Sequence, residues 1–413
     1  MPGRLLRRPL FWLALASAAL AVGCVRLNVH RAPTATAVTP ATVRIATYNT
    51  SLYDNTSGGL IRRLEVGDEN ARSIAAVLQR VRPDIVRLNE FDYDEQQRAA
   101  ELFQRRYLEV AQPGGGEALR YPYRFLAPVN TGVPSGLDLD RSGSVGGDGR
   151  TLGDDAWGYG LHPGQYGMLV LSQYPIDLRD VRTFQLLRWS ALPGARQPID
   201  PATGEPWYAP QTWSQLRLSS KSHWDVPIRT PNGRLHLLAA HPTPPVFDGP
   251  EDRNGARNFD EIRLWKEYLD PGPAPWLCDD TGRCGGLPAD ASFVIAGDYN
   301  ADPDDGDGVR GAIAQLLAHP RVIDEPIPRS AGAVERAAER RIERHGDVAT
   351  HTGDFGTSSG TLRLDYVLPS SDLRVQDAGV FWPPSTSRDA AIAKASDHHL
   401  VWLDVQWPAS NTR

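Results

Sequence analysis

The amino-acid sequence predicts an α/β fold in one large domain with long surface loops. Apolar runs of strand length are separated by a segment, residues 69–81, in which Ile74, Val77, Leu78 and Val81 recur at helical spacing. Of the 413 residues, 41% are hydrophobic and 23% are charged, which is typical of a globular protein with a sizeable core. The sequence shows no internal repeat, which favours one domain over an array of small units.

Several predicted strands end in a polar side chain that suits catalysis. The strands and their polar residues are 43–49 with Asn49, 85–90 with Glu90, 235–241 with His241, and 293–300 with Asp298 and Asn300. Asp298 and Asn300 are two positions apart, so they lie on the same face of their strand. The repeated pattern predicts that the ends of these strands meet at one site.

The last two predicted strands carry their polar residues differently. Asp365 lies inside the strand at residues 362–368, and Asp397 and His398 precede the final strand at residues 400–405. If the final strand runs antiparallel to the strands that end in polar residues, its beginning lies at the same edge of the sheet. We therefore expect Asp365, Asp397 and His398 to join the same site.

Two segments are expected to be surface loops that interrupt the domain. Residues 114–163 and 270–290 are rich in Gly, Asp and Pro and show little apolar periodicity. The second segment contains Cys278 and Cys284, which could close a small loop through a disulfide in an oxidising compartment. A zinc site needs more ligands than two thiols, so we expect the disulfide.

The first 24 residues have the pattern of a signal peptide that directs export. Arg4, Arg7 and Arg8 precede an apolar run at residues 10–22, which is too short for a convincing membrane span. Cys24 ends a segment similar to a bacterial lipobox, so lipidation of this cysteine and ordinary cleavage nearby both stay open. Residues 25–42 are expected to be a tether and residues 43–407 the folded domain. We expect an exported monomer that is either secreted or periplasmic, or held at a membrane only through a lipid on Cys24.

The net charge argues against tight binding of duplex DNA. The formal net charge is −6, and it becomes −9 once the first 24 residues, with three arginines and no acid, are removed. No run of Lys and Arg could follow a duplex backbone, although such contacts normally supply most of the non-specific affinity for DNA. Small or single-stranded phosphoesters are therefore the expected substrates.

The polar residues at the strand ends together suit phosphoester hydrolysis, which needs a cation, a base and donors to the phosphate oxygens. Mg²⁺ and Mn²⁺ take hard oxygen ligands, and Asn49, Glu90 and Asp397 suit such a site. A histidine oriented by a carboxylate is a common general base, and His398 could form this pair with Asp365 or Asp397. The remaining candidates are Asp298 and Asn300, which would position the water and the phosphate, and His241, which would donate to the phosphate oxygens.

Six of these fragments, in this order, resemble the signature of the endonuclease/exonuclease/phosphatase superfamily. They are Ala46-Thr47-Tyr48-Asn49, residues 84–90 ending in Glu90, His241, Gly297-Asp298-Tyr299-Asn300, Arg363-Leu364-Asp365-Tyr366 and Ser396-Asp397-His398. Each fragment alone is weak evidence, whereas six in the right order are specific. The resemblance extends over about residues 42–407 and implies a four-layer αββα sandwich, with its site where the two central sheets meet at one edge.

The resemblance also implies a role for each candidate residue. Glu90 is similar to the metal-binding glutamate, Asn49 to its neighbouring ligand, and Asp397 to a second carboxylate on the metal side. Asp298 and Asn300 are similar to the pair that orients the attacking water and the phosphate. The remaining implied roles are those of His398 at the reaction centre, Asp365 as its orienting partner and His241 as a phosphate-binding residue. Whether Asp298 or His398 accepts the proton stays open.

Other polar residues have simpler interpretations. Residues 302–308 lack the distal glutamate of a calcium loop and predict a polar turn. Residues 356–360 match the pattern of a serine-hydrolase elbow but lead into a strand, so we reject that function. His345 and His351 are expected to be surface or loop residues. Arg253 and Arg257 precede a helix expected from about Asn258. They could be ordinary surface residues, or either could reach a substrate phosphate.

The sequence therefore predicts an exported, metal-dependent phosphoesterase, and two alternatives stay open. One is an extracellular endonuclease that acts on DNA. The other is a non-catalytic exported binding lipoprotein with the same fold. All the candidate catalytic residues are present, which favours an enzyme over a binding protein.

Overall fold

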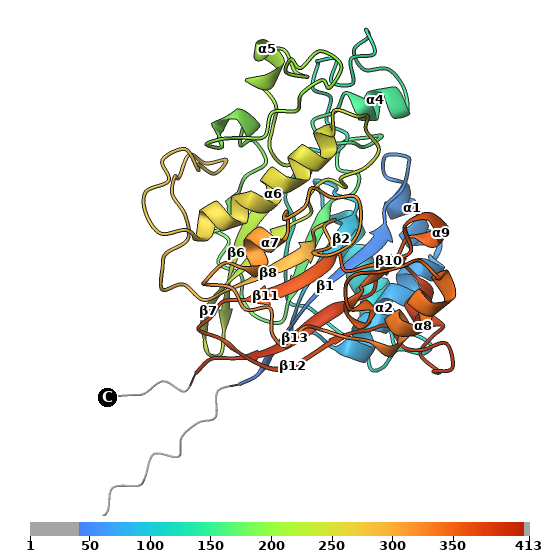
Figure 1. The fold of residues 1–413 in the computed structure, drawn as a ribbon. Coiled ribbons are helices and arrows are strands. Elements are labelled where there is room, and N and C mark those ends of the chain that lie inside the picture. Colours follow the sequence, from blue (N-terminus) through green and yellow to red (C-terminus); the bar gives the residue numbers. More distant parts are fainter. Residues whose placement is uncertain (1–40, 409–413) are drawn as a thin grey trace, which may run out of the picture. The chain divides into compact units, whose positions relative to one another are not determined.

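Two β-sheets form the core of the protein in a computed structural model, which describes residues 41–408 (Figure 1). The first sheet has the order β12-β13-β1-β2-β4-β3, and the second has the order β11-β8-β7-β6-β5. The strands of the first are β1 (Val43–Leu52), β2 (Ile85–Phe91), β3 (Tyr123–Phe125), β4 (Met168–Ser172), β12 (Arg374–Val380) and β13 (Val401–Gln406). Those of the second are β5 (Arg182–Thr183), β6 (His223–Thr230), β7 (Gly233–Ala240), β8 (Phe293–Asp298) and β11 (Asp365–Pro369). A short separate pair consists of β9 (Gly353–Asp354) and β10 (Thr361–Leu362).

The inner faces of the two sheets share one apolar layer. Val43 and Ile45 of β1 belong to the same buried cluster as Trp224 and Val226 of β6 and Leu237 of β7. Alternation along each strand sends every second side chain into this layer, and burial of apolar area of this kind is the main favourable term in folding.

Helices cover the outer faces of both sheets. On the first sheet, Leu88 of β2 clusters with Ile74 of α2 (Glu69–Val81), beside α1 (Gly59–Val66) and α3 (Arg98–Phe103). On the second sheet, Ile295 of β8 clusters with Trp265 of α6 (Arg253–Leu269), near α7 (Ala314–Leu317). The order helix, sheet, sheet, helix is the predicted four-layer αββα sandwich, and it is confirmed (Figure 1).

The remaining helical segments are short and lie mostly in connections. They are η1 (Gln104–Leu108), α4 (Arg150–Asp154), η2 (Trp189–Ala191), α5 (Pro210–Trp213), α8 (Ala331–Arg340), η3 (Val348–Thr350), α9 (Gly356–Ser359) and η4 (Ile392–Lys394). Among the described helices, none combines the length and the apolar character needed to cross a membrane. The predicted signal peptide, Cys24 and residues 25–40 of the predicted tether lie outside the described residues.

The strand directions confirm that the beginning of the last strand shares an edge with the ends of the earlier ones. β1 is parallel to β2 and antiparallel to β13. In the second sheet β7 is parallel to β8, which is antiparallel to β11, with Asp365 opposite Asp298. Several strand bounds differ from the prediction: β11 begins at Asp365 and does not contain it in its interior, and β7 and β8 end before His241 and Asn300.

Four further expectations can be compared with the structure. Residues 270–290 contain no helix or strand, and the disulfide between Cys278 and Cys284 is present. The expectation that α6 begins at about Asn258 was wrong, because the helix begins at Arg253. The carboxylate of Asp248 stabilises this earlier first turn by accepting the backbone N–H of Asn254 at 2.6 Å. His351 was expected to be a surface or loop residue, and it lies in the loop between η3 and β9. It is buried, and its Nδ1 lies 2.8 Å from the Oγ1 of Thr361.

Candidate active site

The eight predicted site residues lie at one edge of the two sheets, where the strands that carry them end or begin. Asn49 and Glu90 lie near the ends of β1 and β2, His241 follows β7, Asp298 ends β8, Asn300 follows it, Asp365 begins β11, and Asp397 and His398 precede β13. A cavity of about 980 Å³ lies here, and its lining includes six of the eight: Glu90, His241, Asp298, Asn300, Asp397 and His398. The other two do not line the cavity but are hydrogen-bonded to residues that do: Asn49 to Asp298, and Asp365 to His398. The structure therefore brings all eight residues together.

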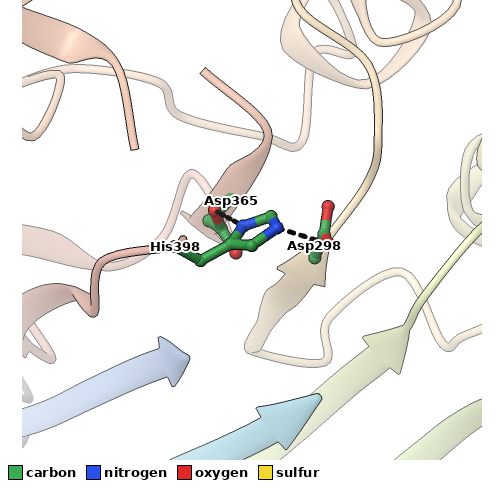
Figure 2. A group of neighbouring side chains, drawn as sticks. All are labelled: Asp298, Asp365 and His398. Atoms are coloured by element: carbon green, nitrogen blue, oxygen red, sulfur yellow. Dashed lines mark hydrogen bonds and ion pairs between the residues drawn. The ribbon is translucent and has the colours of Figure 1, made fainter. Parts of the chain in front are cut away.

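A histidine between two aspartates forms the centre of the site (Figure 2). The Nδ1 of His398 lies 2.8 Å from Asp365 Oδ2, and its Nε2 lies 3.6 Å from Asp298 Oδ2. Thr352 Oγ1 also donates to Asp365 Oδ2, over 2.8 Å. Between the two partners that the sequence allowed for His398, the structure thus places Asp365, and not Asp397, in contact with the ring.

The electrostatics of this centre favour opposite charges on His398 and Asp298. Burial lowers the pKa of His398, but the carboxylates of Asp365 and Asp298 outweigh it and hold the pKa well above its ordinary value. Burial raises the pKa of Asp298, but the nearby His398 and His241 outweigh it and the pKa lies below its ordinary value. Burial raises the pKa of Asp365 to about 6, against the opposing effect of His398. The side chains are therefore arranged for proton transfer, with an anionic acceptor beside a cationic donor.

The donor atoms of Asp298, Asp365 and His398 lie within 4.8 Å of one another, so this trio is also close enough to bind a metal ion. We favour the hydrogen-bonded interpretation. A metal ion on either ring nitrogen of His398 would have to displace a proton, because Asp365 at Nδ1 and Asp298 at Nε2 both stabilise the protonated ring.

The carboxylate of Asp298 accepts hydrogen bonds from residues that lie near the ends of different strands. Its Oδ2 accepts from the Nδ2 of Asn49 at 3.0 Å and lies 3.4 Å from the Nε2 of His241. Its Oδ1 accepts from the backbone N–H of Asn300 at 2.9 Å, and Asn300 adopts a left-handed φ of 49°. Burial, and then the charge of Lys221, lower the pKa of His241 to about 3, so this ring is neutral. Its Nδ1 is buried and has no hydrogen-bond partner among residues 41–408, and donation by His241 to a phosphate stays a prediction.

The predicted metal side of the site offers only hard oxygen donors. Glu90 has a left-handed φ of 55°, a strained conformation for a residue other than glycine, and lines the cavity together with Asp397. Asp397 is exposed, and the Oγ of Ser396 donates to its Oδ1 at 3.3 Å. Burial raises the pKa of Glu90 to about 7, although the amide of Asn49 acts in the opposite direction. Carboxylates and an amide fit Mg²⁺ or Mn²⁺ and would not fit a thiophilic ion.

The structure adds polar residues that the sequence analysis did not select. Lys221, just before β6, lines the cavity, and Thr352 orients Asp365. Arg87 is fully buried within β2, and its Nη2 lies 2.7 Å from the Sδ of Met168. Its Nε and Nη1 have no hydrogen-bond partner in the part of the chain that the structure describes. An arginine in the middle of a buried strand is a signal that the sequence does contain, whereas nothing in its local sequence marks Thr352.

The arginines considered as phosphate ligands already have protein partners. Arg257 donates to the backbone carbonyls of Leu218 and Trp157, at 2.9 and 2.6 Å, which makes it a support for the backbone. Arg253 lines the cavity but pairs with Glu251. The segment at residues 302–308 is a polar turn, as predicted, in which the side chain of Asp302 accepts two backbone N–H groups.

Comparisons with known proteins identify the family. The profile described as the Endonuclease/Exonuclease/phosphatase family matches residues 46–398. No curated protein matches the sequence. Among solved structures, the chain is similar to an endonuclease/exonuclease/phosphatase from Beutenbergia cavernae DSM 12333, with 18% identity and a TM-score of 0.48, over 89% of this chain and 72% of that one.

Two other solved structures show a similar degree of likeness. Sphingomyelinase C from Streptomyces griseocarneus is 18% identical, with a TM-score of 0.44 over 88% of this chain and 99% of that one. A family protein from Bacteroides thetaiotaomicron is 12% identical, with a TM-score of 0.46 over 91% and 98% of the two chains. The profile match covers well over half of the sequence, and with it the protein belongs to the endonuclease/exonuclease/phosphatase family of phosphoester hydrolases.

Proposed function

We propose that this protein is a divalent-metal-dependent phosphoesterase that uses Mg²⁺ or Mn²⁺ and prefers small or single-stranded phosphoesters. One observation carries the proposal: the buried Asp365–His398–Asp298 array lies at a cavity that Glu90 and Asp397 also line. Proton-transfer groups beside hard oxygen ligands are the two components that metal-assisted phosphoester hydrolysis needs.

Each side chain of the site has a defined part in this proposal. Asn49, Glu90 and Asp397 would hold the cation, which when bound neutralises charge that develops on the phosphate oxygens. Asp298 accepts the proton of the attacking water, because the adjacent imidazolium of His398 favours its anionic form. Asp365 orients the ring of His398 and stabilises its positive charge, with a hydrogen bond of 2.8 Å.

The cavity and the net charge support the substrate preference. A volume of about 980 Å³ lies at the upper end of the range typical of small-ligand sites. The chain has a net charge of −6, so its surface does not attract a long polyanion by charge alone. The endonuclease alternative would have to obtain its affinity from bound cations, which can offset the local negative charge.

A panel of substrates tests this proposal. With Mg²⁺ at low salt, we expect a higher kcat/KM on bis(p-nitrophenyl) phosphate, p-nitrophenyl phosphate or single-stranded DNA than on plasmid DNA, because duplex binding relies on counterion release. Far more efficient cleavage of the plasmid than of every small substrate would support the endonuclease instead. Absence of turnover on the whole panel with both Mg²⁺ and Mn²⁺ would favour the non-catalytic binding lipoprotein.

We also propose that the protein is exported, either after cleavage just before Cys24 with lipid added to that cysteine, or after ordinary cleavage nearby without lipid. The basic and apolar pattern of this segment supports export, as does the disulfide between Cys278 and Cys284, because disulfides persist in oxidising compartments. The measurement is the intact mass of the protein purified from the exported and membrane fractions of a bacterial host. Lipidation predicts a chain that starts at Cys24 with added acyl mass. A full-length chain confined to the cytosol would contradict export.

A further inference from the structure

Lys221 is a buried lysine in the catalytic cavity. The whole chain contains three lysines, Lys221, Lys266 and Lys394, among 44 basic residues. Only 5% of Lys221 is exposed, and it lines the cavity together with Glu90, His241 and Asp298. A lysine almost never occupies such a buried position unless it is paired or has a function.

The other cations that line the cavity all have partners within the protein. They are Arg150 with Asp154, Arg253 with Glu251, Arg257 with the carbonyls of Leu218 and Trp157, and Arg344 with the carbonyl of Ser359. Within residues 41–408, the ammonium of Lys221 makes no hydrogen bond and no ion pair. It is thus the cavity cation whose donors are all available to a ligand.

The backbone that carries Lys221 is held rigidly. The backbone N–H of Asn130 donates to the carbonyl of Lys221 at 2.9 Å. The backbone N–H of Ser220 donates to Glu261 Oε1, and that of Thr243 donates to Glu261 Oε2, both at 2.6 Å. Glu261 of α6 is fully buried, so one carboxylate joins the segment of Lys221 to the segment that follows His241. The backbone from which the Lys221 side chain extends is therefore already ordered, so a ligand would not have to order it.

An ammonium in this position is costly for the folded protein unless a ligand completes its surroundings. The carboxylates of Glu261, Glu90 and Asp298 attract it without forming a hydrogen bond, and burial lowers its pKa. The same cavity presents several carboxylates to a substrate that is itself an anion. A fixed positive charge beside them would reduce that repulsion and supply donors to oxygens of the substrate.

We propose that the Nζ of Lys221 binds a non-bridging oxygen of the substrate phosphate, which makes Lys221 a substrate-binding residue of this site. The inference rests on the proposed function, because it takes a phosphoester as the ligand. It also deepens that function, because it assigns recognition of the phosphate charge to one residue outside the six family fragments.

The test compares Lys221→Met and Lys221→Arg with the matched control Lys266→Met, which removes a lysine from the outer part of α6. The readouts are kcat and KM on bis(p-nitrophenyl) phosphate, the affinity for inorganic phosphate by calorimetry in the presence of Mg²⁺, and Tm. We expect Lys221→Met to lower kcat/KM and phosphate affinity by about 10- to 100-fold, the effect of losing a hydrogen bond to a charged group. Its Tm should stay equal or rise, because a desolvated charge is removed. Lys221→Arg should retain part of both functions, and Lys266→Met, which loses only an ion pair with Asp270 away from the cavity, should match the wild type in kcat/KM and phosphate affinity.

Three results would overturn the assignment. Wild-type kcat/KM and phosphate affinity in Lys221→Met would show that Lys221 does not touch the phosphate, and the proposed function would stand. If both Lys221 variants lose phosphate affinity and both also have a lower Tm than the wild type, the role of Lys221 is structural. If the wild type hydrolyses no phosphoester, the proposed function fails. The calorimetric titration then still tests Lys221, and equal phosphate binding by wild type and Lys221→Met would overturn the inference.

Discussion

Replacement of Asp298 by Asn, or of His398 by Ala, is expected to lower kcat by at least about 100-fold, as removal of an acid–base group commonly does. Asp298→Asn removes the charge that lies 3.6 Å from the Nε2 of His398 and leaves an isosteric amide. His398→Ala removes the ring that joins the two aspartates. Turnover of bis(p-nitrophenyl) phosphate under saturating Mg²⁺ measures both effects.

Matched controls separate chemistry from folding in these variants. Asp304→Asn changes an exposed aspartate, and His345→Ala changes an exposed histidine, neither of which lines the cavity. Both controls should retain the wild-type kcat. The far-UV and near-UV circular dichroism of the two site variants should match that of the wild type. A near-wild-type rate in Asp298→Asn or His398→Ala would mean that the chemistry occurs elsewhere.

Exhaustive chelation is expected to abolish turnover, and Mg²⁺ or Mn²⁺ should restore it. The physical reason is the donor set of Asn49, Glu90 and Asp397, which offers carboxylate and amide oxygens and no thiolate. The measurement is the rate after dialysis against a chelator and then during titration with each cation. Full turnover in the chelated enzyme would contradict the proposed metal dependence.

The variant Glu90→Gln tests whether the required cation binds at the proposed metal side of the site. It should raise the Mg²⁺ concentration needed for half-maximal rate by at least about tenfold, because even the outer partners of metal ligands change affinity by 10- to 100-fold. Glu117→Gln, at an exposed loop position, serves as the control and should not change this concentration. An unchanged Mg²⁺ requirement in Glu90→Gln would remove Glu90 from the metal side.

The secondary structure near the site could largely be predicted from local sequence. α2 occupies residues 69–81 as expected, because its apolar residues face the sheet and Asp68 caps its first turn by accepting the backbone N–H of Ala71 at 2.7 Å. The start of α6 at Arg253 was missed, because its first turn, Arg253-Asn254-Gly255-Ala256, has two polar residues, a glycine and no large apolar side chain, and so shows no apolar periodicity. The roles of the eight candidate residues stay predictions until the variants are measured.

The sequence by itself determined the order of the strands along the chain and the polar residue at each strand end, because alternation and turn chemistry are local properties. Residue chemistry left Asp365 and Asp397 both open as the partner of His398 and the resemblance implied Asp365, but the tertiary structure decided that Asp365 contacts the ring. The structure also decided that Lys221 lies in the cavity with no hydrogen bond or ion pair from its ammonium to any described residue, and that Arg257 supports the backbone. Burial and pairing depend on segments far apart in sequence: His398 meets Asp298 across 100 positions, and Glu261 reaches back 41 positions to Ser220. No local pattern encodes which partners such groups find, because packing of the two sheets and α6 decides which of them lose contact with water.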